Sequence, residues 1–279
     1  LSAVSWVFLA TRLGFPVSVS HSLVAAVLGS GLATAGFSNV DTGVMTKVIL
    51  ALAFSPLLGF GAAFVAMTAT YWIFRGWTPH KVTSVFGKLQ ILSAAFLSYS
   101  HGKNDAQNAM GIMALAWAVY YSSGQNVEVL LWMKMAAAIT MALGVAIGGW
   151  KVIRTLGMRV TRLQPVSGFT ANMCAASVIE VASNLGLPVS TTHTTSTAII
   201  GVGATRRLSA VRWGVTRGIM LAWLVTYPFC AILGWVLSKV LNAVVAVLTT
   251  ELLSALTTIC GCQSIYTKAF YLFSLSSSE

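Results

Sequence analysis

The sequence predicts an all-α polytopic membrane protein made of two inverted repeats, each carrying a re-entrant or broken-helix hairpin. Three observations lead to this fold class. Of the 279 residues, 57% are hydrophobic and only 8% are charged, whereas a soluble domain carries roughly 25% charged residues. Several apolar runs are long enough to cross a bilayer, and a segment near the N-terminus recurs in the second half of the chain.

The apolar runs indicate helices. Residues 44–74, 127–150 and 213–237 each provide the ~20 residues that a helix needs to span a bilayer. Backbone polar groups inside lipid need partners within the protein, so a spanning segment is either a helix or a strand of a closed barrel. Barrel strands are ~10 residues long and alternate between polar and apolar residues, which these continuous runs do not do.

An internal repeat has a constant offset. The segment GFPVSVSH at residues 14–21 matches GLPVSTTH at residues 186–193, which lies 172 residues later. The same offset relates further residues: Ala26 and Ala198, Gly29 and Gly201, Gly31 and Gly203, Pro56 and Pro228. Matches at one offset over this distance predict two copies of one structural unit.

The distribution of positive charge predicts opposite orientations for the two copies. Residues 34–42, after the first copy, contain no Lys or Arg, whereas residues 205–217, after the second, contain four Arg. Basic loops are retained in the cytoplasm, so the first loop is predicted to be external and the second cytoplasmic, together with the basic residues 75–88 and 151–162. Such inverted repeats are common in secondary transporters. The same loop bias explains the net charge of +11, so no nucleic-acid partner is expected.

The crossings between these loops give the expected organisation. Residues 167–184 and 189–204 lie between two basic segments and supply an even number of passes, which fits a hairpin broken at residues 186–188. The predicted division is 1–75 for the remainder of the first repeat, 76–88 for a cytoplasmic linker, 89–240 for the second repeat and 241–279 for a divergent C-terminal segment.

Residues 102–111, with the sequence GKNDAQNAMG, are a polar cluster between two apolar segments. An acid such as Asp105 costs ~3 kcal/mol or more at the centre of a membrane helix, which marks it as a functional candidate. The oxygens of Asn104, Asp105 and Asn108 are hard ligands suited to sodium, and the flanking glycines would let backbone carbonyls join them. The alternative is a polar loop with Asp105 as a helix N-cap. The first copy of this element would fall about 70 residues upstream of Leu1.

Hydroxyl groups cluster where each repeat predicts a new helix. Ser190, Thr191 and Thr192 form this cluster in the second copy, and Ser18 and Ser20 form it in the first. Helix N-termini bind anions through free N–H groups and the helix dipole, so an anion-binding role is predicted. Simple capping of the two helices is the alternative.

Three further residues are accessory candidates. His21 and His193 follow the hydroxyl clusters and would relay protons or bind anions, or would be structural hydrogen-bonded residues. Glu180 lies in an apolar run and would take a proton or pair with a neighbouring polar group. No phosphate-binding Walker loop, nucleophile elbow or zinc-protease motif is present, so neither an enzyme nor a cofactor is expected.

Taken together, these motifs resemble those of the inorganic phosphate transporter (PiT) family, which carries an Asn-Asp motif and a Pro-Ser-Thr-Thr-His motif in each inverted half. Residues 102–111 and 186–193 match both motifs in the second half, and residues 16–22 keep part of the second motif in the first half. The resemblance covers roughly residues 1–237. Lys103 stands where the family has a small residue, and Val19 stands where it has Thr.

The resemblance implies a bacterial-type symporter that moves phosphate with sodium or protons by alternating access of the two halves. It implies that Asp105, Ser190, Thr191, Thr192, Ser18 and Ser20 bind phosphate and that Asn104, Asp105 and Asn108 bind the cation. It also implies a multi-pass protein of the bacterial inner membrane, and it leaves a homodimer open. The alternatives are a sulfate permease of the same superfamily and a non-transporting membrane sensor or scaffold.

Overall fold

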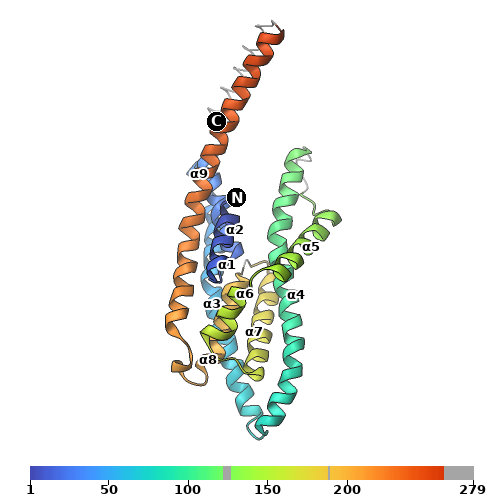
Figure 1. Ribbon diagram of the computed structural model, residues 1–279, viewed down its shortest axis with the longest axis vertical. Coiled ribbons are helices and arrows are strands. Elements are labelled where there is room, and N and C mark those ends of the chain that lie inside the picture. Colours follow the sequence, from blue (N-terminus) through green and yellow to red (C-terminus); the bar gives the residue numbers. More distant parts are fainter. Residues whose placement is uncertain (122–126, 188, 261–279) are drawn as a thin grey trace.

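The computed structural model describes residues 1–121, 127–187 and 189–260, and every regular element in this part of the chain is helical (Figure 1). The long helices are α3 (Thr42–Ile73), α4 (Pro79–Tyr120), α5 (Leu131–Ile147) and α9 (Trp213–Cys260). The hairpins are formed by α1 (Ser2–Leu13) with α2 (Val19–Ala35) and by α7 (Pro165–Asn184) with α8 (Thr191–Ala204). The short elements are α6 (Trp150–Arg154), the π-helix η2 (Thr155–Val160) and the 3₁₀ turns Phe37–Asn39 and Leu208–Ala210.

The membrane-spanning character predicted from the apolar runs is confirmed. Met45–Ile73 and Trp213–Glu251 are long and apolar enough to cross a membrane. Leu131–Ile147 and Trp150–Val160 pass the same test together, with a bend of 61° between them, so up to three spans occur in the described residues by this measure. An all-α membrane protein is therefore the observed fold class.

Both hairpins break in the same way. Gly14 ends α1 with a φ of 83°, and Gly186, at the equivalent repeat position, has a φ of 67°. Only glycine adopts this left-handed backbone at little cost, which explains why both copies have Gly there. The following amides also make the same bond, Phe15 N to Ala10 O and Leu187 N to Ala182 O, each at 2.9 Å. Pro188, part of the predicted break, lies outside the described residues.

The two repeats run in opposite directions, and the hairpin helix of each repeat packs on the long helix of the other. The equivalent helices α3 and α9 traverse the molecule in opposite senses in Figure 1. The hairpin helix α2 packs against α9 of the other repeat, and α8 packs against α3. Glycines permit both approaches: a Cβ on Gly29 would lie 2.0 Å from Ala231 O, and one on Gly201 would lie 2.6 Å from Phe60 O.

Helix α8 lies in the interior. All its residues except Thr192 and Thr195 are buried, and its apolar side chains join a core shared with α3, α4 and α7. This packing places the Ser/Thr-rich start of α8 inside the molecule rather than at its surface.

The basic loops after α3 and α8 lie at one end of the molecule. Arg206 Nη2 donates to Gln164 Oε1 at 2.7 Å, and Arg212 N donates to Val160 O at 2.9 Å, which joins the loop before α7 to the loop before α9. The turn between α3 and α4 lies at the same end in Figure 1, opposite the turn between α2 and α3. This arrangement agrees with the assignment of residues 75–88 and 205–217 to one side of the membrane. Most of residues 151–162 instead forms α6 and η2 of the bent helix pair, and Lys151 donates to Arg12 O beside the first hairpin tip.

Two predicted boundaries look different in the structure. The proposed linker 76–88 is mostly helical, because α4 begins at Pro79. The proposed C-terminal segment starts within α9, which continues to Cys260, and residues 261–279 lie outside the described part of the chain. The division into 1–75, 76–88, 89–240 and 241–279 remains a prediction.

Candidate anion and cation site

The two hairpin tips meet in the interior with matching geometry. Ser18 is the N-cap of α2 and Ser190 is the N-cap of α8, and each Oγ accepts a bond at 3.2 Å from the backbone N–H three residues later. Those amides belong to His21 and His193, whose rings lie 4.4 Å apart. The Ser18 and Ser190 tips, which occupy the same repeat position, therefore lie side by side.

The capping geometry is compatible with anion binding. A helix begins with four N–H groups that have no partner in the helix, and each serine cap occupies one of them. Thr192, in the first turn of α8, donates its hydroxyl to Val17 O of the other tip at 3.3 Å. Capping of the helices and donation to an anion are therefore not exclusive alternatives at these tips.

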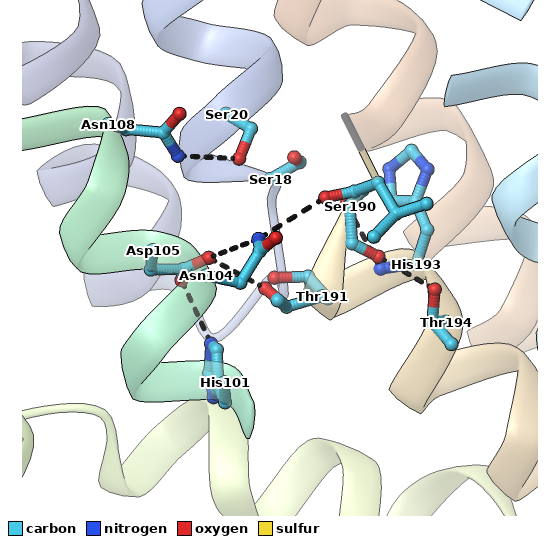
Figure 2. Close-up of polar contacts among 12 residues, drawn as sticks. Ser18, Ser20, His101, Asn104, Asp105, Asn108, Ser190, Thr191, His193 and Thr194 are labelled. Atoms are coloured by element: carbon cyan, nitrogen blue, oxygen red, sulfur yellow. Dashed lines mark hydrogen bonds and ion pairs between the residues drawn. The ribbon is translucent and has the colours of Figure 1, made fainter. Parts of the chain in front are cut away.

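Helix α4 contacts both tips (Figure 2). Asn108 Nδ2 donates to Ser20 Oγ in the first hairpin at 3.0 Å, and Thr191 Oγ1 in the second hairpin donates to Asp105 Oδ1 at 3.1 Å. Asn104 Nδ2 lies 3.4 Å from Asp105 Oδ1 and 3.4 Å from Val189 O. The polar face of α4 thus brings an acid and two amides to the place where the two repeats meet.

Asp105 is largely shielded from solvent. Its side chain is 10% exposed, and its second oxygen, Oδ2, lies 2.9 Å from His101 Nε2. His101 is a further candidate site residue that the sequence motifs do not include. The four-residue spacing of His101 and Asp105 places both on one face of a helix, a signal that exists only if residues 102–111 are helical.

The alternative interpretation of residues 102–111, a polar loop with Asp105 as an N-cap, is wrong, because the whole segment lies inside the continuous helix α4. Asp105 is consequently no N-cap, and the carbonyls near Gly102 and Gly111 lie within helical backbone rather than in an open loop. A glycine inside a helix costs only ~1 kcal/mol, whereas an unpaired backbone group in lipid costs several, so continuity is favoured. A cation held by α4 would therefore be bound through side chains.

A cavity of about 220 Å³ opens beside these groups. Its polar lining residues are Ser20, Asn104, Gln107, Asn108 and Ser183. It is smaller than the 300–1,000 Å³ typical of pockets for organic ligands, so its size suits small ions.

The accessory candidates lie around this centre. His193 stacks on Trp223 with ring centroids 3.9 Å apart, and the His21 ring meets Tyr227 edge-on at 5.8 Å. A second cavity of about 400 Å³ opens on this side of the tips. Glu180 pairs with Lys103 rather than facing Asp105. The two histidines thus pack against aromatic rings of α9 on one side of the tips, while the acid and amides of α4 lie on the other side.

This fold and site define a class: an integral membrane protein whose paired helix tips and buried carboxylate are typical of ion-coupled transport proteins. The chain belongs to the phosphate transporter family, whose model matches residues 1–234. The family and the relatives below are transport proteins rather than enzymes.

Individual relatives of this chain carry names that agree with the family. A "Probable low-affinity inorganic phosphate transporter" of Bacillus subtilis (strain 168) is 38% identical over 246 residues, which cover 88% of this chain and 73% of the relative. A protein of the same name from Rhizobium meliloti (strain 1021) is 40% identical over 233 residues, which cover 84% of this chain and 70% of the relative. A solved structure titled "The sodium-dependent phosphate transporter" has a TM-score of 0.79, 28% identity, and coverage of 87% of this chain and 78% of that chain.

Proposed function

We propose that this protein is a symporter that moves inorganic phosphate across the membrane with a coupled cation. One observation carries the proposal: α4 contacts both hairpin tips at once, through Asn108 to Ser20 and through Asp105 to Thr191. An ion bound at this junction would contact both inverted repeats together.

Phosphate would bind between the tips. A dianion leaving water needs many hydrogen-bond donors and a compensating positive charge. Two helix N-termini supply N–H groups and favourable dipoles, and the surrounding hydroxyls supply further donors. The proposed phosphate ligands are Ser18, Ser20, Ser190, Thr191, Thr192 and Asp105, the last through a shared proton or through the cation.

The cation would bind on the α4 side, to side-chain oxygens of Asn104, Asp105 and Asn108. Carboxylate and amide oxygens match the preference of a hard cation. The resemblance to a structure titled as a sodium-dependent transporter favours sodium. The Asp105–His101 contact at 2.9 Å is the feature that favours the other candidate, a proton.

Alternating access would follow from the exchanged packing of the repeats. Each hairpin helix rests on the long helix of the other repeat, α2 on α9 and α8 on α3. Rocking of these two pairs about the tips would open the site to one side and then the other. The bacterial relatives favour the bacterial plasma membrane as the location. A homodimer remains a proposal based on the family resemblance.

Sulfate is the competing substrate. At neutral pH phosphate can donate a hydrogen bond to a carboxylate, whereas sulfate has no proton to donate. The carboxylate of Asp105 beside the tips therefore favours phosphate.

The first prediction tests the role of Asp105 in the full-length protein. Asp105→Asn keeps the shape of the side chain but removes its charge, so sodium-driven uptake of labelled phosphate in proteoliposomes should fall at least ~100-fold. Glu128→Gln, at an exposed position in the loop before α5, is the matched control and should leave uptake unchanged. Near-normal uptake by Asp105→Asn would refute the assigned role. Uptake of phosphate and of sulfate, each with and without a sodium gradient, separates the substrates and the coupling ions.

A further inference from the structure

An ion pair joins α4 to α7 close to the site. Lys103 Nζ lies 2.5 Å from Glu180 Oε1, and the two side chains are 31% and 23% exposed. The other carboxylate oxygen, Glu180 Oε2, is buried without a hydrogen-bond partner in the described part of the chain. Lys103 is therefore the charged partner that the structure records for this carboxylate.

The pair lies at the end of a long helix–helix contact. Gly168 of α7 lies so close to Gln90 of α4 that an added Cβ would be 2.4 Å from Gln90 Nε2. Further along, Asn172 Nδ2 lies 3.5 Å from Ser93 Oγ. The contacts advance in the same direction along both helices, and the Lys103–Glu180 pair is the one nearest the hairpin tip, where α7 ends at Asn184.

A second contact joins α4 to the second hairpin at the other end of its tip. Asn104, next to Lys103 in α4, donates to Val189 O, immediately before the cap of α8, at 3.4 Å. One turn of α4 therefore contacts the chain on both sides of the tip between Leu185 and Ser190: Lys103 contacts α7 before it, and Asn104 contacts Val189 at its end. The ion pair anchors the incoming side and the neutral amide anchors the outgoing side.

We infer that Lys103 and Glu180 are positioning residues that hold the second hairpin tip against the polar face of α4 and thereby set the affinity for phosphate. The inference rests on the proposed function of that site. A charge-assisted contact between partly buried groups is roughly twice as strong as a neutral one and is less screened by salt than a surface pair. Because α4 carries Asp105 and α8 begins with Thr191 directly after the tip, a shift between α4 and the tip would separate these two proposed ligands.

The experiment is a charge-reversal series in the full-length protein, measured as phosphate uptake into proteoliposomes under a fixed sodium gradient. Lys103→Ala and Glu180→Ala should each raise the KM for phosphate about tenfold while the maximal rate changes less than about twofold. Lys103→Arg keeps the charge and should stay near the wild-type KM. The reversed pair Lys103→Glu/Glu180→Lys should recover most of the lost affinity, because opposite charges again face each other.

Asn172→Ala is the matched control, since it removes a neutral contact from the same helix pair further from the tip and should leave the KM unchanged. The thermal unfolding midpoint of each purified variant separates positioning from general stability. An unchanged KM in Lys103→Ala, or a reversed pair no better than the single variants, would overturn the inference while leaving phosphate transport intact. If the wild type shows no sodium-driven phosphate uptake, the proposed function fails instead, and isothermal titration of phosphate into the same variants still tests whether the pair sets affinity.

Discussion

At the scale of single residues, the site depends on side chains whose hydrogen bonds reach beyond their own helix or turn. Asp105 accepts from Thr191 of the second hairpin and contacts His101 and Asn104 of its own helix. A carboxylate that is only 10% exposed needs such partners, because a buried charge without them is strongly destabilising. A candidate role for Asp105 can be predicted from the sequence, since an acid among apolar residues is conspicuous. The partnership with His101 cannot, because it depends on α4 being continuous.

A prediction at this scale concerns His101. Its Nε2 lies 2.9 Å from Asp105 Oδ2, so His101→Ala removes a contact that fixes the position of the carboxylate. The sodium concentration needed for half-maximal uptake should rise about tenfold, in line with the ~1.5–3 kcal/mol of a hydrogen bond to a charged group. The measurement is phosphate uptake as a function of sodium concentration. His80→Ala, at the exposed start of the same helix, is the control. A sodium dependence that is equal in both variants would contradict this role for His101.

At the scale of elements, the hairpin helices depend on close backbone approach. Gly29 of α2 faces Ala231 of α9 and Gly201 of α8 faces Phe60 of α3, and both glycines lie at the same repeat position. Small residues at helix interfaces allow the van der Waals contact that drives helix association in membranes. The repeat predicts that these glycines are equivalent, but their contacts appear only when the helices of opposite repeats are placed together.

The element-scale prediction compares two glycines of α2. Gly29→Ala would place a Cβ within 2.0 Å of Ala231 O, where backbone rather than a flexible side chain must move. The variant should lose at least ~1–3 kcal/mol of stability through overpacking. Gly31→Ala is the control, because nothing lies within 4 Å of the added Cβ. The thermal unfolding midpoint in detergent checks both variants, and equal midpoints would show that α2 and α9 do not approach as described.

At the scale of the whole molecule, inversion of the repeats places their equivalent loops at opposite ends. The turn after α2 lacks Lys and Arg, whereas the loop after α8 carries Arg206 and Arg207 and is bonded to the loop before α7 through Arg206. Basic residues near helix ends remain in the cytoplasm, so the charge pattern and the topology support each other.

The prediction at this scale is a labelling pattern. Ser38→Cys and Ser209→Cys, both exposed, are introduced into a background without the native cysteines. A membrane-impermeant thiol reagent should label Ser38→Cys in intact cells, but should label Ser209→Cys only after permeabilisation. Labelling of both from the same side would rule out the inverted arrangement.

Much of the architecture can be predicted from local features of the chain. The apolar runs correspond to α3, α5 and α9, and the repeated Gly-x-Pro segments mark two breaks where Gly14 and Gly186 take positive φ. The structure contradicts one alternative, a polar loop at residues 102–111, because this segment of glycines and polar residues lies within the uninterrupted helix α4. Glycine disfavours a helix only weakly, whereas apolar surroundings require every backbone group to be paired, and that requirement depends on the environment.

The sequence by itself determined that the chain forms membrane helices and that one unit occurs twice with opposite orientation. It also predicts hydroxyls and a carboxylate as the ion-binding groups. Only the tertiary structure decided which helix of one repeat packs on which helix of the other, and that Lys103 meets Glu180 while Asp105 meets Thr191. The reason is physical: hydropathy, caps and turn preferences act over a few residues, whereas these contacts join residues far apart in the chain. Such contacts depend on the fit of whole surfaces, which no short stretch of sequence encodes.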